Sequence, residues 1–132
     1  MLNFTNPGIL LAIAAGGAIG AVARYLVMSA VGHWIGHGYP WGTIIVNVVG
    51  SFILGALIET MALVWSPSEA VRAMLVIGVL GSFTTFSTFS LDVQSLIVRG
   101  DFLQAGGYIT GSVIAGVAAF LAGMALFRYV WS

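Results

Sequence analysis

The sequence predicts an all-α membrane protein with four transmembrane helices, and three observations support this fold class. Of the 132 residues, 60% are hydrophobic and only 6% are charged, whereas soluble domains carry about 25% charged residues. A soluble domain of this size has too little interior to bury so much apolar surface. The apolar residues also fall into four stretches that are long enough to cross a bilayer, which takes about 20 residues. We therefore expect a single four-helix transmembrane domain over residues 1–132.

The first two stretches are separated by a polar hinge. The first begins after Asn6-Pro7, a typical N-cap followed by proline at the first helical position, and runs from about Gly8 to Val31. The first twenty residues contain no basic segment, so we expect no cleaved signal peptide. A glycine-rich hinge over residues 32–40 follows, and the second stretch runs from about Trp41 to Trp65.

The third stretch begins at a capping box, residues 66–69. We expect Ser66 to cap the helix and Glu69 to reach back to it. This stretch runs from about Ala70 to Val98.

The fourth stretch follows a tight turn at residues 99–101 and runs from about Phe102 to Val130. Gly100 suits a positive φ at the end of a helix, and we expect Asp101 to cap the fourth helix. Because the connections are short, neighbouring helices should be antiparallel.

The four arginines predict no strong preference for one orientation in the membrane. With antiparallel spans, Arg72 and Arg128 lie on the side of the termini and Arg99 on the other side, with Arg24 nearer to Arg99. Flanking arginines set the orientation of membrane proteins. A count this close to balance predicts insertion in both orientations and an antiparallel, dual-topology homodimer.

Small residues recur at a spacing of four, which allows helices to approach closely. We expect most of the eighteen glycines to serve packing alone. The spaced pairs are Gly16 and Gly20, Ser51 and Gly55, Gly107 and Gly111, and Ser112 and Gly116.

The third span contains a run of hydroxyl residues, Gly81–Ser90, interleaved with phenylalanines. Serine and threonine side chains bond to the backbone and compete with helical hydrogen bonds. We therefore expect the third helix to be broken near its middle, at Gly81–Thr84. Carbonyl groups freed at membrane depth must be buried in protein or bind an ion, and carbonyl oxygens suit a hard cation.

Polar side chains at membrane depth are the main candidates for function, because each costs free energy without a partner or a water-filled path. Asn47 lies mid-span, with Thr43 one turn before it and Ser51 one turn after it on the same face. This row either lines a pathway or holds helices together. Arg24 either extends its side chain to the membrane interface, or bonds to carbonyls, or attracts anions into a vestibule.

Phe86 and Phe89 are three residues apart and share a helix face. Ring edges are weakly positive, so the pair either attracts an anion without trapping it or belongs to the bundle core. Asp92, about one turn further, lies either at the membrane interface or at the mouth of such a pathway.

The sequence also disfavours several classes of function. There is no cysteine, no nucleophile–base pair and no glycine-rich loop after a strand, so we expect no enzyme activity. The glycines around His33 and His37 argue against a metal site there. The net charge is zero, which disfavours binding to nucleic acid.

Three segments resemble the Fluc (CrcB) family of fluoride channels, in the same order and over nearly the whole chain. They contain Gly16-Gly17 to Arg24-Tyr25, Gly42-Thr43 to Gly50-Ser51-Phe52, and Thr84-Thr85-Phe86-Ser87-Thr88-Phe89. The second and third segments at this spacing are specific, whereas the first alone is weak.

The resemblance implies a fluoride-selective channel in the bacterial inner membrane, built as an antiparallel homodimer with two pathways. It would export fluoride passively and lower the cytoplasmic concentration. By position, Phe86 and Phe89 would supply ring edges and Asn47 a hydrogen bond to fluoride. Thr43, Thr88 and Ser112 would form a polar track, and Arg24 would lie near a vestibule. The carbonyls of Gly81 and Thr84 would hold a structural sodium ion at the dimer interface.

Two other classes of protein are weaker matches. A proton-coupled drug exporter needs a membrane-embedded carboxylate, usually in its first helix, and this chain has no acidic residue before Glu59. A non-transporting assembly subunit would leave the polar row through Thr43, Asn47 and Ser51 unexplained.

Overall fold

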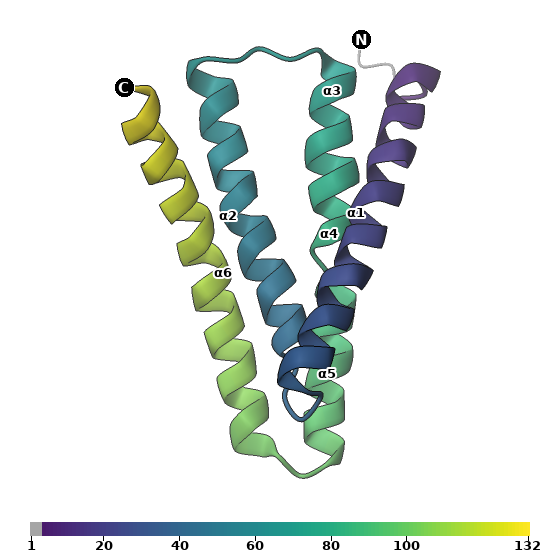
Figure 1. Cartoon of the computed structure of the whole chain (residues 1–132), viewed down its shortest axis with the longest axis vertical. Coiled ribbons are helices and arrows are strands. Elements are labelled where there is room, and N and C mark those ends of the chain that lie inside the picture. Colours follow the sequence, from purple (N-terminus) through teal and green to yellow (C-terminus); the bar gives the residue numbers. More distant parts are fainter. Residues whose placement is uncertain (1–3) are drawn as a thin grey trace.

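The protein is an all-helical bundle whose chain passes up and down four times (Figure 1). The structure, a computed structural model, describes residues 4–132; residues 1–3 of the expected domain lie outside the described residues. Four helical segments are long and apolar enough to cross a membrane, as predicted. The elements are α1 (Pro7–Ile35), α2 (Trp41–Leu63), α3 (Glu69–Ala73), η1 (Met74–Leu80), α4 (Gly81–Phe83), α5 (Phe86–Val98) and α6 (Phe102–Trp131).

Consecutive spans are antiparallel, and the start of α1, the end of α6 and the α2–α3 connection lie at the same end of the molecule (Figure 1). We call this the terminal end. The α1–α2 loop and the α5–α6 turn lie at the opposite end, which we call the loop end. Arg72 and Arg128 therefore fall at the terminal end and Arg99 at the loop end, as the sequence predicted.

The first helix begins as expected and continues further than expected. The Asn6 side chain accepts hydrogen bonds from the amides of Gly8 and Ile9, with Pro7 at the first helical position. The helix then extends four residues beyond Val31, because the amide of Gly36 bonds to the Gly32 carbonyl and Gly36 takes a positive φ of 96°. The expected hinge over residues 32–40 is thus shortened to residues 36–40.

Two of the predicted caps are wrong. The third span is capped by Ser68, whose hydroxyl accepts from the Val71 amide, rather than by Ser66. Asp101 occupies the N-cap position of α6 but makes no side-chain cap, because its carboxylate pairs with Arg99 at 3.5 Å. Gly100 does take a positive φ, 81°.

The third span is broken near its middle, as predicted, and the break lies at Thr84 and Thr85. Both have extended backbone angles, with ψ of 158° and 114°. Gly81, the expected first residue of the break, is still helical. Before the break the chain forms a π-helix, η1, and such segments occur frequently at functional sites.

Glycines set the closest helix contacts in the bundle. A Cβ on Gly16 or Gly20 would lie 2.3 or 2.1 Å from a carbonyl oxygen of η1, and one on Gly55 would lie 2.1 Å from the Phe120 carbonyl of α6. At these three positions the neighbouring backbone is so close that a residue larger than glycine does not fit without a shift of the helices. Gly107 and Gly111, in contrast, face open space, so the predicted packing of that pair does not occur within one chain.

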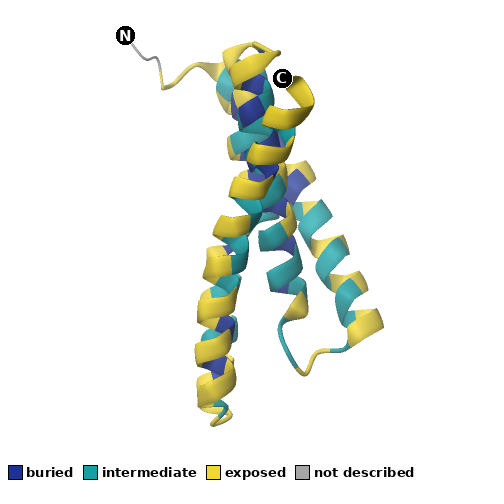
Figure 2. Cartoon of the chain, turned by 90° about the vertical axis from the view of Figure 1, so that its left-hand side faces the viewer, coloured by how far each residue is buried: buried dark blue, intermediate teal, exposed yellow. Residues whose placement is uncertain are grey.

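Few side chains are buried within the single chain, and exposed residues cover most of each helix (Figure 2). Large apolar side chains such as Leu11, Leu103 and Val113 are more than half exposed. Exposed apolar area on this scale indicates contact with lipid or with another protein surface.

Candidate functional site

Asn47 binds the backbone at the break in the third span through two hydrogen bonds. Its side-chain nitrogen donates to the Thr85 carbonyl at 3.1 Å, and the Thr85 amide donates to its side-chain oxygen at 2.7 Å. The break exposes these two backbone groups at membrane depth, where an unpaired polar group is costly. Asn47 therefore holds helices together, one of its two predicted roles, and within residues 4–132 no acceptor is seen for its second amide hydrogen.

Thr85 and Thr88 organise the start of α5. The Thr85 hydroxyl accepts a hydrogen bond from the Thr88 amide at 3.1 Å and donates to the Thr88 hydroxyl at 3.0 Å. This is the side-chain cap of the second half of the broken helix. Among the described residues, no acceptor is seen for the hydroxyl hydrogen of Thr88.

Arg24 binds the first half of the broken helix at its end. Its Nε donates to the Ser82 carbonyl at 3.0 Å. A cation is stabilised at a helix C-terminus, where carbonyls lack helical partners. This contact matches the carbonyl-bonding interpretation of Arg24.

Gly81 and Thr84 both line a cavity of about 270 Å³ beside Asn47. At the end of α4, the Leu80 carbonyl accepts from the amide and hydroxyl of Thr84. Within the described residues, no such bond is seen to the carbonyls of Gly81 and Thr84. These two oxygens fit the donor set that a hard cation prefers.

A row of aromatic rings leads from the break toward the loop end. The rings of Phe86 and Phe89 lie 5.5 Å apart, so the two residues share a face as predicted. Phe89 stacks on Tyr108 of α6 at 5.1 Å, and Tyr108 is 1% exposed. Phe86, in contrast, is 78% exposed in the single chain.

The row ends at a carboxylate held by two hydroxyl groups. Asp92 Oδ2 accepts hydrogen bonds from Thr43 Oγ1 at 2.6 Å and from the Tyr108 hydroxyl at 2.9 Å. The three groups come from α2, α5 and α6. Thr43 is 2% exposed, so both hydroxyl donors are withdrawn from bulk solvent.

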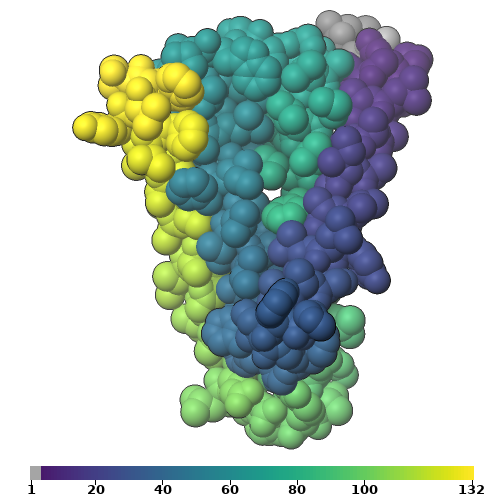
Figure 3. All heavy atoms as spheres, viewed as in Figure 1, coloured from purple at the N-terminus to yellow at the C-terminus, as the bar shows by residue number. Residues whose placement is uncertain are grey.

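Thr43 and Asp92 of this cluster line a cavity of about 550 Å³ near the loop end, and Asp92, the lining residue of α5 farthest from that end, marks its base. Its walls come from the α1–α2 loop with the adjoining ends of α1 and α2, and from α5; Figure 3 shows the loop side chains on the face turned to the viewer at this end. We call this cavity the vestibule. Its polar lining residues are His37, Thr43, Asp92, Gln94, Ser95 and Arg99.

Ser112 lies one turn beyond Tyr108 on the same face of α6. Its hydroxyl is buried and has no hydrogen-bond partner among the described residues. Both residues line a cavity of about 330 Å³ together with Tyr39 and Trp41. An unpaired buried hydroxyl at a cavity is a polar group with an interaction left to make.

Tyr108 is the site residue that sequence reasoning missed. Its signal was its spacing, because it precedes Ser112 by four residues and so shares its face. A tyrosine hydroxyl within a span also needs a partner, and in the structure that partner is Asp92.

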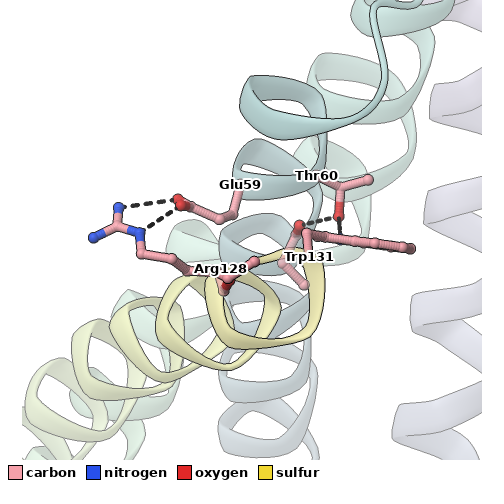
Figure 4. Close-up of polar contacts among 6 residues, drawn as sticks. Glu59, Thr60, Arg128 and Trp131 are labelled. Carbon is pink, nitrogen blue, oxygen red and sulfur yellow. Dashed lines mark hydrogen bonds and ion pairs between the residues drawn. The ribbon is translucent and has the colours of Figure 1, made fainter.

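A second polar cluster lies at the terminal end, away from the break. Arg128 binds Glu59 through two hydrogen bonds, with Nε to Oε1 at 2.6 Å and a terminal nitrogen to Oε2 at 3.3 Å (Figure 4). Beside them, Trp131 Nε1 donates to the Thr60 hydroxyl at 2.9 Å. This cluster fastens the end of α6 to α2.

Comparison with known proteins identifies relatives over nearly the whole chain. The family model described as "CrcB-like protein, Camphor Resistance (CrcB)" matches residues 11–124. A protein of Rhodospirillum centenum named fluoride-specific ion channel FluC is 52% identical over 119 residues, covering 90% of this chain and 94% of that protein.

Two further relatives carry the same name. The protein of Nitrobacter winogradskyi is 48% identical over 92% of this chain and 96% of its own length. That of Agrobacterium fabrum is 49% identical over 88% of this chain and 93% of its own length. The chain is therefore a multi-pass membrane protein that belongs to the CrcB-like family, the family of these fluoride-specific ion channels.

Proposed function

We propose that this protein is a fluoride channel that exports fluoride passively across the bacterial cytoplasmic membrane and so lowers cytoplasmic fluoride. The relatives named fluoride-specific ion channel support the choice of ion. An inside-negative potential of 100 mV favours exit of an anion by about 2.3 kcal/mol, or about 50-fold in concentration. No energy source beyond the potential is needed.

The observation that carries the proposal is the row from Phe86 through Phe89 and Tyr108 to Asp92. Fluoride is small and strongly hydrated, so hydrogen-bond donors must replace its water. The hydroxyls of Thr43 and Tyr108 already point their hydrogens at an anionic oxygen, Asp92 Oδ2. A fluoride ion entering from the vestibule takes over those same hydrogens.

Beyond this cluster the pathway offers weaker contacts, as conduction requires. The ring edges of Phe89 and Phe86 provide weak positive potential, and the second amide hydrogen of Asn47 and the hydroxyls of Thr88 and Ser112 add donors. Arg24 Nε donates to the Ser82 carbonyl, and this bond holds the guanidinium beside the break, where its positive charge attracts an anion.

The direct test is ion efflux from liposomes that contain the purified protein. We expect rapid, voltage-driven fluoride efflux and no chloride efflux above that of protein-free liposomes. Equal efflux of the two ions would contradict fluoride selectivity, and absence of fluoride efflux would contradict the channel itself.

We also propose that the working form is an antiparallel, dual-topology homodimer. The exposure of Phe86 supports this, because a pathway residue facing lipid needs a second wall. The open face at Gly107 and Gly111 has the small side chains that let helices approach closely. Reporter fusions at the C-terminus should reveal both orientations, and a single strict orientation would contradict dual topology.

A structural sodium ion at the dimer interface is the last part of the proposal. Gly81 and Thr84 would hold it through their carbonyls, and a second copy would double the number of oxygen ligands. When bound, the ion would neutralise the carbonyl dipoles freed by the break. Replacing sodium with a large organic cation should then lower the melting temperature of the dimer, whereas an unchanged value would contradict the site.

A further inference from the structure

The charges around the vestibule nearly cancel, so the charge of one further residue can decide the net charge of the cavity. Asp92 lies at the base and Arg99 lines the wall. Arg99 also pairs with Asp101 at 3.5 Å and donates to the Gly38 carbonyl at 3.3 Å. Asp101 does not line the vestibule, but it pairs with Arg99 and offsets its charge, so the Asp92 carboxylate leaves the mouth with one net negative charge, which repels an anion.

His37 is the residue that can change this balance. It lines the vestibule opposite α5 and is exposed to solvent. Its imidazole lies over the last turn of α1, where a Cβ on Gly32 would approach His37 Cε1 to 2.3 Å. Histidine changes its charge between about pH 5 and 8, unlike the acidic and arginine groups around it.

The chain contains a second histidine that provides an internal control. His33 lies in α1, four residues before His37, and its ring packs edge-on against Trp34 at 5.4 Å. It does not line the vestibule. The remaining titratable group of the α1–α2 loop, Tyr39, packs against Trp41 and Tyr108 and is uncharged near neutral pH.

We propose that His37 sets the charge of the channel mouth and makes fluoride entry pH-dependent, an inference that rests on the proposed function. Protonated His37 cancels the net negative charge of the vestibule and removes its repulsion of fluoride. Deprotonated His37 restores that repulsion. Fluoride entry is therefore faster at pH 6 than at pH 8.

The expected size of the effect follows from a single charge acting through a water-filled cavity. A cleft that is lined by charges of one sign raises the local concentration of oppositely charged ions by about 10-fold or more. One unit charge at about 10 Å in a high-dielectric mouth changes it by roughly two- to threefold. Salt screens this interaction over about 10 Å at 0.1 M and about 3 Å at 1 M.

The experiment is a measurement of fluoride current across a planar bilayer, with the same pH on both sides and fluoride well below saturation. Current is preferable to efflux because neutral hydrogen fluoride carries none. In low salt, we expect the wild-type current to be roughly two- to threefold larger at pH 6 than at pH 8. In about 1 M of an inert, impermeant salt the difference should largely disappear.

Three variants assign the effect to one side chain. His37→Gln should give a pH-independent current at the wild-type pH 8 level, and His37→Arg a pH-independent current at the pH 6 level. His33→Gln should behave as the wild type does.

The outcomes separate this inference from the proposed function. A wild-type fluoride current that does not change between pH 6 and 8 would overturn the role of His37 and leave the channel intact. A pH dependence that survives in His37→Gln, or that is lost in His33→Gln, would also overturn it. Absence of fluoride current at every pH would instead contradict the proposed function.

Discussion

Glu59 at the terminal end and Asp92 near the loop end are both carboxylates within apolar spans, yet their partners differ in kind. Glu59 is 4% exposed and both of its oxygens are bound by the guanidinium of Arg128. Asp92 accepts from two neutral hydroxyl groups, and one of its oxygens takes both bonds. The first carboxylate is saturated by a fixed cation, whereas the second lies at the base of a vestibule.

The difference separates a structural acid from one that belongs to a pathway. A two-point contact between arginine and carboxylate fixes geometry, and removal of one partner leaves a buried charge without compensation. Hydroxyl groups rotate, so those around Asp92 can turn their hydrogens toward another anion. We infer that the terminal end holds the bundle together and the loop end admits the ion.

The largest effect is expected from Phe89→Ile, which removes the ring between Phe86 and Tyr108. Isoleucine has no positive ring edge, so fluoride flux should fall by about 100-fold or more while the dimer remains folded. The matched control at the terminal end is Phe127→Ile, which removes a ring that contacts only Trp131 among the described aromatic residues. Liposome efflux and gel filtration check both variants. Equal losses of flux in the two variants would contradict the claim that only the loop end carries the pathway.

A smaller effect is expected from removing one hydroxyl donor beside Asp92. A hydrogen bond to a charged group contributes about 1.5–3 kcal/mol, so Thr43→Val or Tyr108→Phe should each lower fluoride flux roughly tenfold or more. Thr60→Val removes a hydroxyl from the same helix at the terminal end. It should leave flux within about twofold of the wild type, and a loss as large as that of Thr43→Val would contradict the assignment.

The smallest effect on transport is expected from breaking the terminal ion pair. Glu59→Gln should lower the melting temperature of the protein in detergent, because the two charge-assisted hydrogen bonds from Arg128 are replaced by weaker bonds to a neutral amide. Glu59→Asp keeps the charge on a shorter side chain, so its melting temperature should lie between those of the wild type and Glu59→Gln. An unchanged melting temperature in Glu59→Gln would show that the pair does not stabilise the bundle.

The sequence predicted features that depend on local pattern and missed those that depend on the packing of distant helices. Four apolar stretches predicted the spans, and the run of hydroxyl residues after Gly81 predicted the break. The break lies later, at Thr84 and Thr85, because Asn47 clamps the Thr85 backbone from another helix. No local pattern specifies that contact.

The candidate site was predicted in part for the same reason. Residues on one helix face, such as Phe86 and Phe89, follow directly from their spacing. The hydroxyl cluster around Asp92 joins three helices, and the Glu59–Arg128 pair joins residues 69 positions apart. These partners depend on how α6 is aligned along its neighbours, which the apolar composition of the spans leaves undetermined.

The most direct test of the division between the two ends compares Asp92→Asn with Glu59→Gln in a single efflux assay. Each variant neutralises one carboxylate with almost no change in shape, and flux is expressed per folded dimer. We expect Asp92→Asn to lower fluoride flux at least tenfold, because a neutral acceptor holds and orients the Thr43 and Tyr108 hydroxyls less strongly, and this loss outweighs the roughly two- to threefold gain from removing one negative charge from the vestibule. Glu59→Gln should remain within about twofold of the wild type. Normal flux in Asp92→Asn, or an equal loss in both variants, would contradict this account.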